Sequence, residues 1–286
     1  MVDVRCFLPS SLRLTPAGNW PMIPVMSFRA CILASGSSGN CTFVASDTTA
    51  ILVDAGLSAR AIGQRLESIG ERMDGVRGVC ISHEHSDHTT GLRVLHQKQG
   101  VPLFANRGTA EALERDPDLR GVPWTVFTTG APFTIGDLTI EPFSVPHDAY
   151  EPVGFIIQCG GSRVGVVTDM GMATTLVRER LRGCRMIVVE SNHDEQMLRD
   201  CQNRPWQLKQ RILGRQGHLS NQGAAALLAE IASPTLDTVF LAHLSKDCNT
   251  PDLARQTTHD TLFRAGHHHI KVNLTFPDRP TEVWAG

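Results

Sequence analysis

The chain places four possible metal ligands within six residues. The run His-Glu-His-Ser-Asp-His begins at His83, directly after the apolar segment Val76–Ile81. In an extended backbone, residues i and i+2 project to the same side, so His83 and His85 can hold one ion together. The turn that follows directs Asp87 and His88 towards a second ion. Imidazole nitrogen and carboxylate oxygen suit zinc, manganese or iron. The spacing therefore predicts a metal site rather than a His-rich surface loop.

Three further candidate ligands, His147, Asp169 and His243, each follow an apolar strand-like segment. Loops that follow strands gather at one edge of a sheet. Taken alone, each residue is more often a capping or hydrogen-bonding side chain. Together with the first run they complete a site for two divalent ions. The expected ligands are His83, His85 and His147 for the first ion and Asp87, His88 and His243 for the second, with Asp169 bridging.

The segments around these residues alternate between strand and helix patterns. Strands are expected at 30–33, 41–45, 50–53, 76–81, 101–105, 124–128, 138–144, 154–158, 163–168, 186–190, 238–242 and 270–275, the last closing the chain. Helices are expected at 58–69, 90–99, 109–114, 176–182 and 224–231, and from 251 onwards. This order predicts an α/β fold, a four-layer αβ/βα sandwich formed by residues 26–286 as one domain, with the metal site at one edge of the two sheets.

Residues 1–25 differ from the rest because four prolines interrupt them and no periodic pattern appears. They contain no uninterrupted apolar core of the kind a signal peptide needs. We therefore expect a disordered extension, and Met26 could be the natural start.

Composition narrows the possible partners. The 286 residues carry a net charge of −2, so bulk charge does not attract nucleic acid and any polyanion site must be local. The eight cysteines form no CxxC pair, which indicates reduced thiols in a cytoplasmic protein. No apolar run reaches the ~20 residues of a membrane span, so no membrane partner is expected. The oligomeric state does not follow from the sequence.

Several motifs carry a family resemblance. The strings SHEHSDHTTGL, SVPHD, VVTDMG and FLAHLS, in this order, resemble those of the metallo-β-lactamase superfamily over residues 28–255. ILASGSSGNCTFV, VVESNHD and GHLSNQGAA are similar to its YycJ/WalJ-like branch, whose members are regarded as DNA exonucleases. The resemblance implies a two-metal hydrolase that acts on nucleic acid, with DNA favoured over RNA. The chain lacks the cap domain of the mRNA-processing branch and the arm of the tRNA-processing branch.

A basic segment, residues 199–215, supports a phosphate-binding surface. It contains Arg204, Lys209, Arg211 and Arg215 and leads towards a predicted helix start. A helix N-terminus beside basic side chains suits a phosphate group. A solvated helix face remains the alternative.

The GHLSN and ESNHD strings supply the remaining candidates. Ser220 or Asn221 would cap the following helix and lie near substrate. His218 is the candidate general acid, and Asp87 is expected both to bind metal and to orient the attacking water. His193 would touch substrate or orient a ligand, although a structural role is equally open.

These observations favour a nuclease in which two ions activate a water molecule for attack on phosphorus. The alternative is a small-molecule hydrolase of a thioester, lactone or cyclic phosphodiester, which the acidic pI and the missing cap domain favour. A metal-binding protein without catalysis is a third class, disfavoured by the full set of seven ligands.

Overall fold

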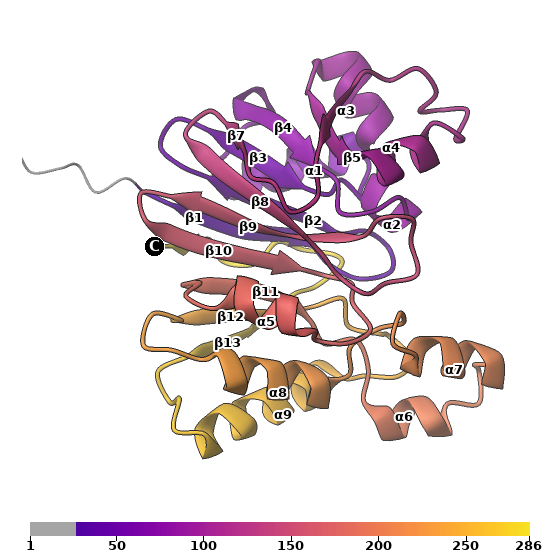
Figure 1. Cartoon of the computed structure of the whole chain (residues 1–286), viewed down its shortest axis with the longest axis vertical. Coiled ribbons are helices and arrows are strands. Elements are labelled where there is room, and N and C mark those ends of the chain that lie inside the picture. Colours follow the sequence, from indigo (N-terminus) through magenta and orange to yellow (C-terminus); the bar gives the residue numbers. More distant parts are fainter. Residues whose placement is uncertain (1–26) are drawn as a thin grey trace, which may run out of the picture.

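The computed structural model describes residues 27–286, so the extension predicted at 1–25 lies outside the described residues. Within them, two seven-stranded sheets pack face to face and helices cover both outer faces (Figure 1). The predicted four-layer sandwich is therefore confirmed.

The first sheet has the strand order β14-β1-β2-β3-β4-β5-β6. Its strands are β1 (Arg29–Ala34), β2 (Cys41–Ala45), β3 (Ala50–Val53), β4 (Val76–Cys80), β5 (Leu103–Asn106), β6 (Trp124–Phe127) and β14 (Trp284–Ala285). Side chains of α1 (Ala59–Ser68), α3 (Leu92–Gln99) and α4 (Arg107–Leu113) pack on its outer face. The short α2 (Ser86–Thr89) lies within the His-rich run, and a 3₁₀ turn, Met73–Gly75, precedes β4.

The second sheet has the order β13-β12-β11-β10-β9-β8-β7. Its strands are β7 (Phe133–Ile135), β8 (Leu138–Ser144), β9 (Val153–Cys159), β10 (Ser162–Val167), β11 (Met186–Glu190), β12 (Thr238–Ala242) and β13 (Lys271–Leu274). It is covered by α5 (Thr175–Leu181), α8 (Asn221–Ile231) and α9 (Pro251–Arg264). Two further helices, α6 (Glu195–Asp200) and α7 (Trp206–Leu213), project from the edge of the body at the lower right of Figure 1.

Side chains on the central strands point alternately to the two faces of a sheet, and each face packs on a different layer. In β11, Met186 and Val188 face the core between the sheets, whereas Ile187 and Val189 face the helices. Because successive strand residues point to opposite faces, a strand buried on both sides appears in the sequence as a continuous apolar run. Such runs explain why β2, β3, β11 and β12 have the predicted bounds, whereas β8 alternates between buried and partly exposed residues over most of its length.

The C-terminal part of the chain departs from the prediction. The strand expected to close the chain, 270–275, is β13, but the chain then crosses to the other sheet and ends in β14. Trp284 pairs with Ala30 and packs edge-on against Phe28 at a ring distance of 6.0 Å. β14 is too short to produce a recognisable sequence pattern, and it is defined only by its pairing with β1.

Two predictions about the whole chain can be checked in the described residues. The cysteines of residues 27–286 are unpaired thiols, and all except Cys201 are buried. None of the helices formed by these residues has the length and apolar character needed to cross a bilayer.

The parallel strands at the centre of each sheet position the candidate site. β3, β4 and β5 are parallel neighbours in the first sheet, and β10, β11 and β12 are parallel neighbours in the second. Loops that follow parallel strands emerge at one edge of a sheet. The His-rich run follows β4, Asp169 follows β10 and His243 follows β12.

Candidate metal centre

Three of the predicted ligands form a compact histidine group. Ring nitrogens of His83, His85 and His147 all lie within 4.8 Å of one another. Nε2 of His83 is 3.1 Å from Nδ1 of His85. His147 directs Nδ1 to the carbonyl oxygen of Gly217 at 3.0 Å, which leaves its Nε2 facing the group. The structure thus brings together the three residues expected to hold the first ion.

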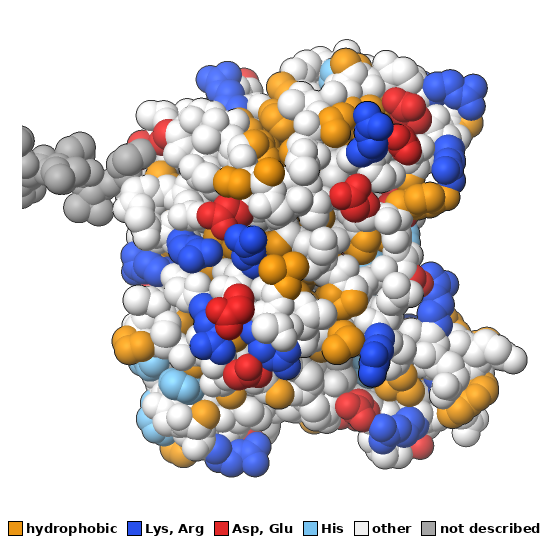
Figure 2. Space-filling model, in the orientation of Figure 1, with side chains coloured by type: hydrophobic (Ala, Val, Ile, Leu, Met, Phe, Trp, Pro, Cys, Tyr) orange, Lys and Arg blue, Asp and Glu red, His pale blue; other side chains and the backbone are white. Residues whose placement is uncertain are grey.

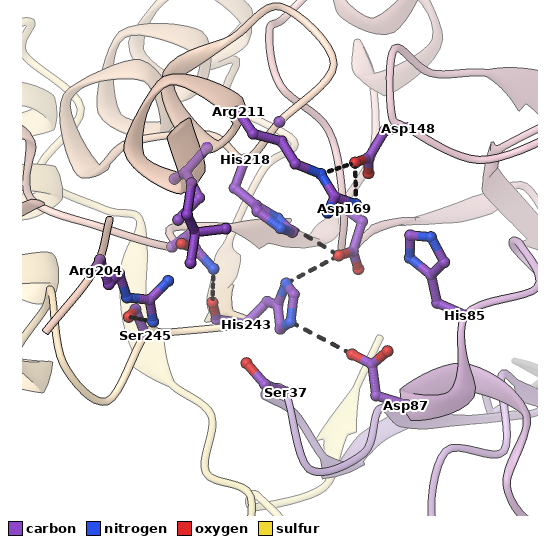
Figure 3. A pocket seen from close by; sticks show the side chains of 14 residues that line it. Ser37, His85, Asp87, Asp148, Asp169, Arg204, Arg211, His218, His243 and Ser245 are labelled. Atoms are coloured by element: carbon purple, nitrogen blue, oxygen red, sulfur yellow. Dashed lines mark hydrogen bonds and ion pairs between the residues drawn. The ribbon is translucent and has the colours of Figure 1, made fainter. Parts of the chain in front are cut away.

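The second predicted group faces the first across Asp169. Oδ2 of Asp87 lies 3.6 Å from Nε2 of His88 and 3.6 Å from Nε2 of His243. Asp169 directs Oδ2 to Nε2 of His88 at 3.2 Å, and its Oδ1 is 3.9 Å from Nε2 of His147. Figure 3 shows Asp169 between His243 and His85. Its carboxylate therefore lies between the two groups, where a bridging ligand is expected.

The donor set fits divalent cations. Two buried atoms of the cluster, Nε2 of His147 and Nε2 of His243, have no hydrogen-bond partner. Burying an unsatisfied polar atom costs about 1–3 kcal/mol. Cations coordinated by these atoms would remove this penalty, and imidazole and carboxylate are suitable ligands. The cluster is therefore suited to binding divalent metal.

Two buried carboxylates that sequence reasoning missed orient the histidines. Asp54 accepts hydrogen bonds from the Ser82 amide and from Nδ1 of His88, both at 2.8 Å. Glu190 accepts from Nδ1 of His243 at 2.9 Å. In each case the partner of Nδ1 fixes the ring so that Nε2 faces the cluster. Asp54 follows a strand, as the recognised ligands do, and this position was the signal that could have identified it.

The turn before β2 also contributes. It reads Gly-Ser-Ser-Gly-Asn, and the side-chain amide of Asn40 donates to Oδ2 of Asp87 at 3.2 Å. Close by, a Cβ atom placed on Gly56 would lie 1.7 Å from the carbonyl oxygen of Asp87. Only glycine fits there, because the backbone carrying the metal-ligand candidates passes directly over it.

Neighbouring charges within the cluster shift one another's pKa values. Burial alone would raise the pKa of Asp169, but His243 and His88 hold it well below its usual range. Burial likewise opposes the charged form of His88, yet Asp54 and Asp169 outweigh it and raise the pKa of His88 to about 10. Burial keeps the pKa of His83 well below its usual value. Because imidazole must be deprotonated to bind a metal, metal binding here displaces protons.

His218 is held beside the cluster by Glu190. Its Nδ1 lies 2.7 Å from Oε1 of Glu190 and 3.7 Å from Oδ1 of Asp169. Glu190 is itself fixed, because its Oε2 accepts from the amides of Met170 and Leu219. Burial lowers the pKa of His218, but the Glu190 carboxylate more than offsets this and raises it. Glu190 therefore favours the protonated form of His218 at the rim of the cluster.

A pocket of about 240 Å³ opens onto the cluster (Figure 3). Arg204 and Arg211 line its other side, and both come from the α6–α7 region. Arg204 donates to Ser245 and Asp247 at 3.3 and 3.2 Å, and Arg211 pairs with Asp148. These contacts hold two guanidinium groups next to the possible metal ligands.

The other predicted substrate-binding residues lie elsewhere. Lys209 is buried and its Nζ donates to the carbonyl oxygen of Arg199 at 2.6 Å. The side chain of Asn221 is buried against Ser191 and Asn249. We therefore correct the prediction by removing Lys209 and Asn221 from the phosphate contacts, because their polar groups are used within the protein.

The remaining three candidates occupy neighbouring positions. Ser220 caps α8, as predicted, by accepting from the amide of Gly223 at 3.1 Å. Arg215 lines a shallow surface hollow beside Arg211 rather than the pocket. His193 is buried and lines a second hollow on the far side of His218.

Comparison with known proteins identifies the family. A family model described as "Beta-lactamase superfamily domain" matches residues 49–244. The chain belongs to the beta-lactamase superfamily. Two solved structures share its fold: YhfI of Bacillus subtilis, with a TM-score of 0.67 and 15% identity over 91% of this chain and 100% of that chain, and zinc-bound PqqB of Methylobacterium extorquens, with a TM-score of 0.64 and 17% identity over 88% and 99%. At these identities the likeness concerns the fold alone.

Two relatives of this superfamily member are considerably more similar in sequence. Exodeoxyribonuclease YycJ of Bacillus anthracis is 35% identical over 90% of this chain and 99% of its own length. Exodeoxyribonuclease WalJ of Streptococcus pneumoniae is 36% identical over 90% of this chain and 98% of its own length. The predicted resemblance is confirmed. Together with the histidine and aspartate cluster, these findings support a metal-dependent hydrolase.

Proposed function

We propose that this protein is a metal-dependent exonuclease that hydrolyses phosphodiester bonds of DNA. The observation that carries the proposal is the 35–36% identity to relatives named exodeoxyribonucleases over nearly their whole lengths. The site supports it with two arginines that flank a candidate metal cluster.

The seven predicted ligands would hold two divalent ions. They are His83, His85, Asp87, His88, His147, Asp169 and His243. Bound there, zinc, manganese or iron would supply Lewis acidity and lower the pKa of water to near neutrality. Histidine and carboxylate ligands without a thiolate do not discriminate sharply among these metals.

The chain's own residues perform the remaining steps. Arg204 and Arg211 would neutralise phosphate charge and hold the DNA strand in position. To do so, each must leave its present partner, Asp247 for Arg204 and Asp148 for Arg211. His218, whose Nδ1 is held by Glu190, would donate a proton to the leaving oxygen. Asp87 contacts both His88 and His243 and would orient the attacking water.

Local rather than bulk charge must attract the polyanion. On the face shown in Figure 2, basic and acidic side chains are interspersed. The net charge of −2 agrees with this mixture. Binding to DNA therefore depends on the few arginines beside the pocket.

A direct test uses metal-free protein reloaded with zinc, manganese or iron and end-labelled linear DNA. We expect progressive shortening from an end, no cleavage of closed circular DNA, and loss of activity with chelator. Asp87→Asn should fold normally but lose most of its rate. A panel of lactones, thioesters and cyclic phosphodiesters runs in parallel. Turnover of that panel without cleavage of DNA or RNA would show that the small-molecule alternative is correct.

A further inference from the structure

A second hollow lies on the other side of His218 from the metal pocket. Its volume is about 350 Å³, and His218 lines both cavities. The hollow is bounded by the loop after β10, the end of α7 and the first turns of α8. Consider a DNA strand whose scissile phosphate lies at the metal cluster beside His218. The next nucleotide of that strand can then reach this second hollow.

Apolar side chains form a large part of the walls of this hollow. They are formed by Met172, Ala173, Leu213, Leu219, Ala226 and Leu227. The charged groups along it are already paired: Arg178 with Glu230 at 2.6 Å, and Glu195 with Arg199 at 2.8 Å. An uncharged ring fits these walls better than an anion does.

The start of α8 is poorly suited to hold a phosphate group here. Two of its first three amides are used within the protein, since Asn221 N donates to the carbonyl oxygen of His193 at 2.8 Å and Gly223 N donates to Ser220 Oγ at 3.1 Å. The occupant is therefore expected to carry its polar groups along a ring edge rather than as a compact negative charge.

His193 supplies an unsatisfied polar group at this hollow. Only 1% of the residue is exposed, and neither ring nitrogen has a hydrogen-bond partner. Burial lowers the pKa of His193 to about 4, so the ring is neutral and offers one donor and one acceptor. A buried imidazole without partners is costly unless a ligand completes its hydrogen bonds.

We propose that this hollow binds the unpaired base of the nucleotide next to the scissile phosphate, with His193 hydrogen-bonding to the edge of the base. This assignment rests on the proposed nuclease function and specifies its substrate. A base held in a Watson–Crick pair cannot enter, and opening a pair costs a few kcal/mol. The enzyme should therefore prefer single-stranded or frayed ends.

The kinetic test compares single-stranded oligonucleotides that differ by one base. A tetrahydrofuran abasic residue is placed at the first or second position from either end, which keeps the sugar and phosphate. At one of these positions, we expect the abasic residue to lower kcat/KM of the wild type on the order of tenfold relative to the normal oligonucleotide. A loss of this size corresponds to the binding free energy that one stacked base commonly contributes. Equal rates for the normal and all abasic oligonucleotides would overturn the base site.

Variants locate the effect. Ala226→Trp fills the hollow from an exposed helix position, and Ala265→Trp, at the exposed C-terminal cap of α9, is the control. Ala226→Trp should lower kcat/KM on the normal oligonucleotide to the abasic level and leave the abasic rate unchanged, with metal content intact. His193→Leu should shrink the preference for the base-bearing substrate. If Ala226→Trp slows both substrates equally, the hollow does not hold a base.

A binding measurement separates this proposal from the proposed function. Calorimetry with deoxyadenosine 5′-monophosphate requires no turnover. Binding by the wild type and Ala265→Trp that is lost in Ala226→Trp supports the base site even if no DNA is cleaved, in which case only the nuclease assignment fails. Equal binding by all three proteins, or binding by none, overturns the base site.

Discussion

At the residue scale, the histidines of the cluster depend on carboxylates that lie behind them. Asp54 holds Nδ1 of His88 and Glu190 holds Nδ1 of His243, each through a buried contact of 2.8–2.9 Å. Such partners fix the ring and its tautomer, and their loss commonly weakens metal binding 10–100-fold. The affinity of the centre is therefore set as much by these two residues as by the ligands.

Replacing Asp54 tests this dependence. Asp54→Asn keeps the shape of the side chain but removes the negative charge that holds His88. We expect metal affinity to fall on the order of 10–100-fold, measured by competition with a chromogenic chelator. Asp252→Asn, at a side chain that is 91% exposed on α9, is the control and should bind as the wild type does. Equal affinities for all three proteins would remove Asp54 from the support of the centre.

A second prediction at this scale concerns pH. The pKa of His193 is about 4 in the folded protein and about 6.5 when unfolded, so the unfolded chain takes up the proton first as pH falls. Stability is thus fully present above pH 6.5 and decreases towards pH 4, by up to about 3 kcal/mol. Urea unfolding in chelator should show a steeper decrease for the wild type than for His193→Gln. Parallel curves would mean that the pKa of His193 is the same in the folded and unfolded protein.

At the element scale, the region that carries the two arginines, α6, α7 and the loop between them, is attached through few buried side chains. α6 and α7 are held by a small apolar cluster of Leu198, Ile212 and Cys248, with Cys201 beside it. Trp206 is 64% exposed, and Leu208 is 36% exposed. Few buried contacts mean a low free energy of local opening. The position of Arg204 and Arg211 therefore depends on this cluster.

Truncating the cluster should loosen these two helices without unfolding the sandwich. For Ile212→Ala we expect faster amide exchange across residues 195–213, weaker DNA binding and unchanged metal content, because the metal ligands lie on other elements. Hydrogen exchange with mass spectrometry measures the first effect. Gln207→Ala, exposed on the same helix, is the control. Exchange that rises equally throughout the protein would show that the cluster belongs to the global core.

These two helices also mark the limit of sequence-based prediction. Doubly buried strands such as β11 and β12 are predictable because their apolar runs are continuous. α6 and α7 have too few buried positions to produce a helical pattern, and β14 exists only through its pairing with β1. The seven ligand candidates follow from residue type and spacing. Asp54 and Glu190 do not, because an orienting role depends on contacts between distant segments.

At the scale of the whole molecule, the fold separates stability from chemistry. The core between the sheets and the two helix-facing cores lie away from the loops that carry the cluster. Loops from both sheets meet at one edge, so the site needs the complete sandwich rather than either half. The overall charge of −2 repels a polyanion weakly, and the affinity for DNA must arise at this edge.

The salt dependence of DNA binding distinguishes local from bulk charge. Arg204→Ala combined with Arg211→Ala removes the two guanidinium groups at the pocket. On duplex DNA in chelator, the slope of log affinity against log salt should flatten by about 1.8, since each lost phosphate contact contributes about 0.9. Arg72→Ala combined with Arg107→Ala removes the same charge from highly exposed positions and should leave the slope unchanged. Equal changes in both double variants would mean that DNA senses only net charge, and the arginines at the pocket would then have no specific role in binding.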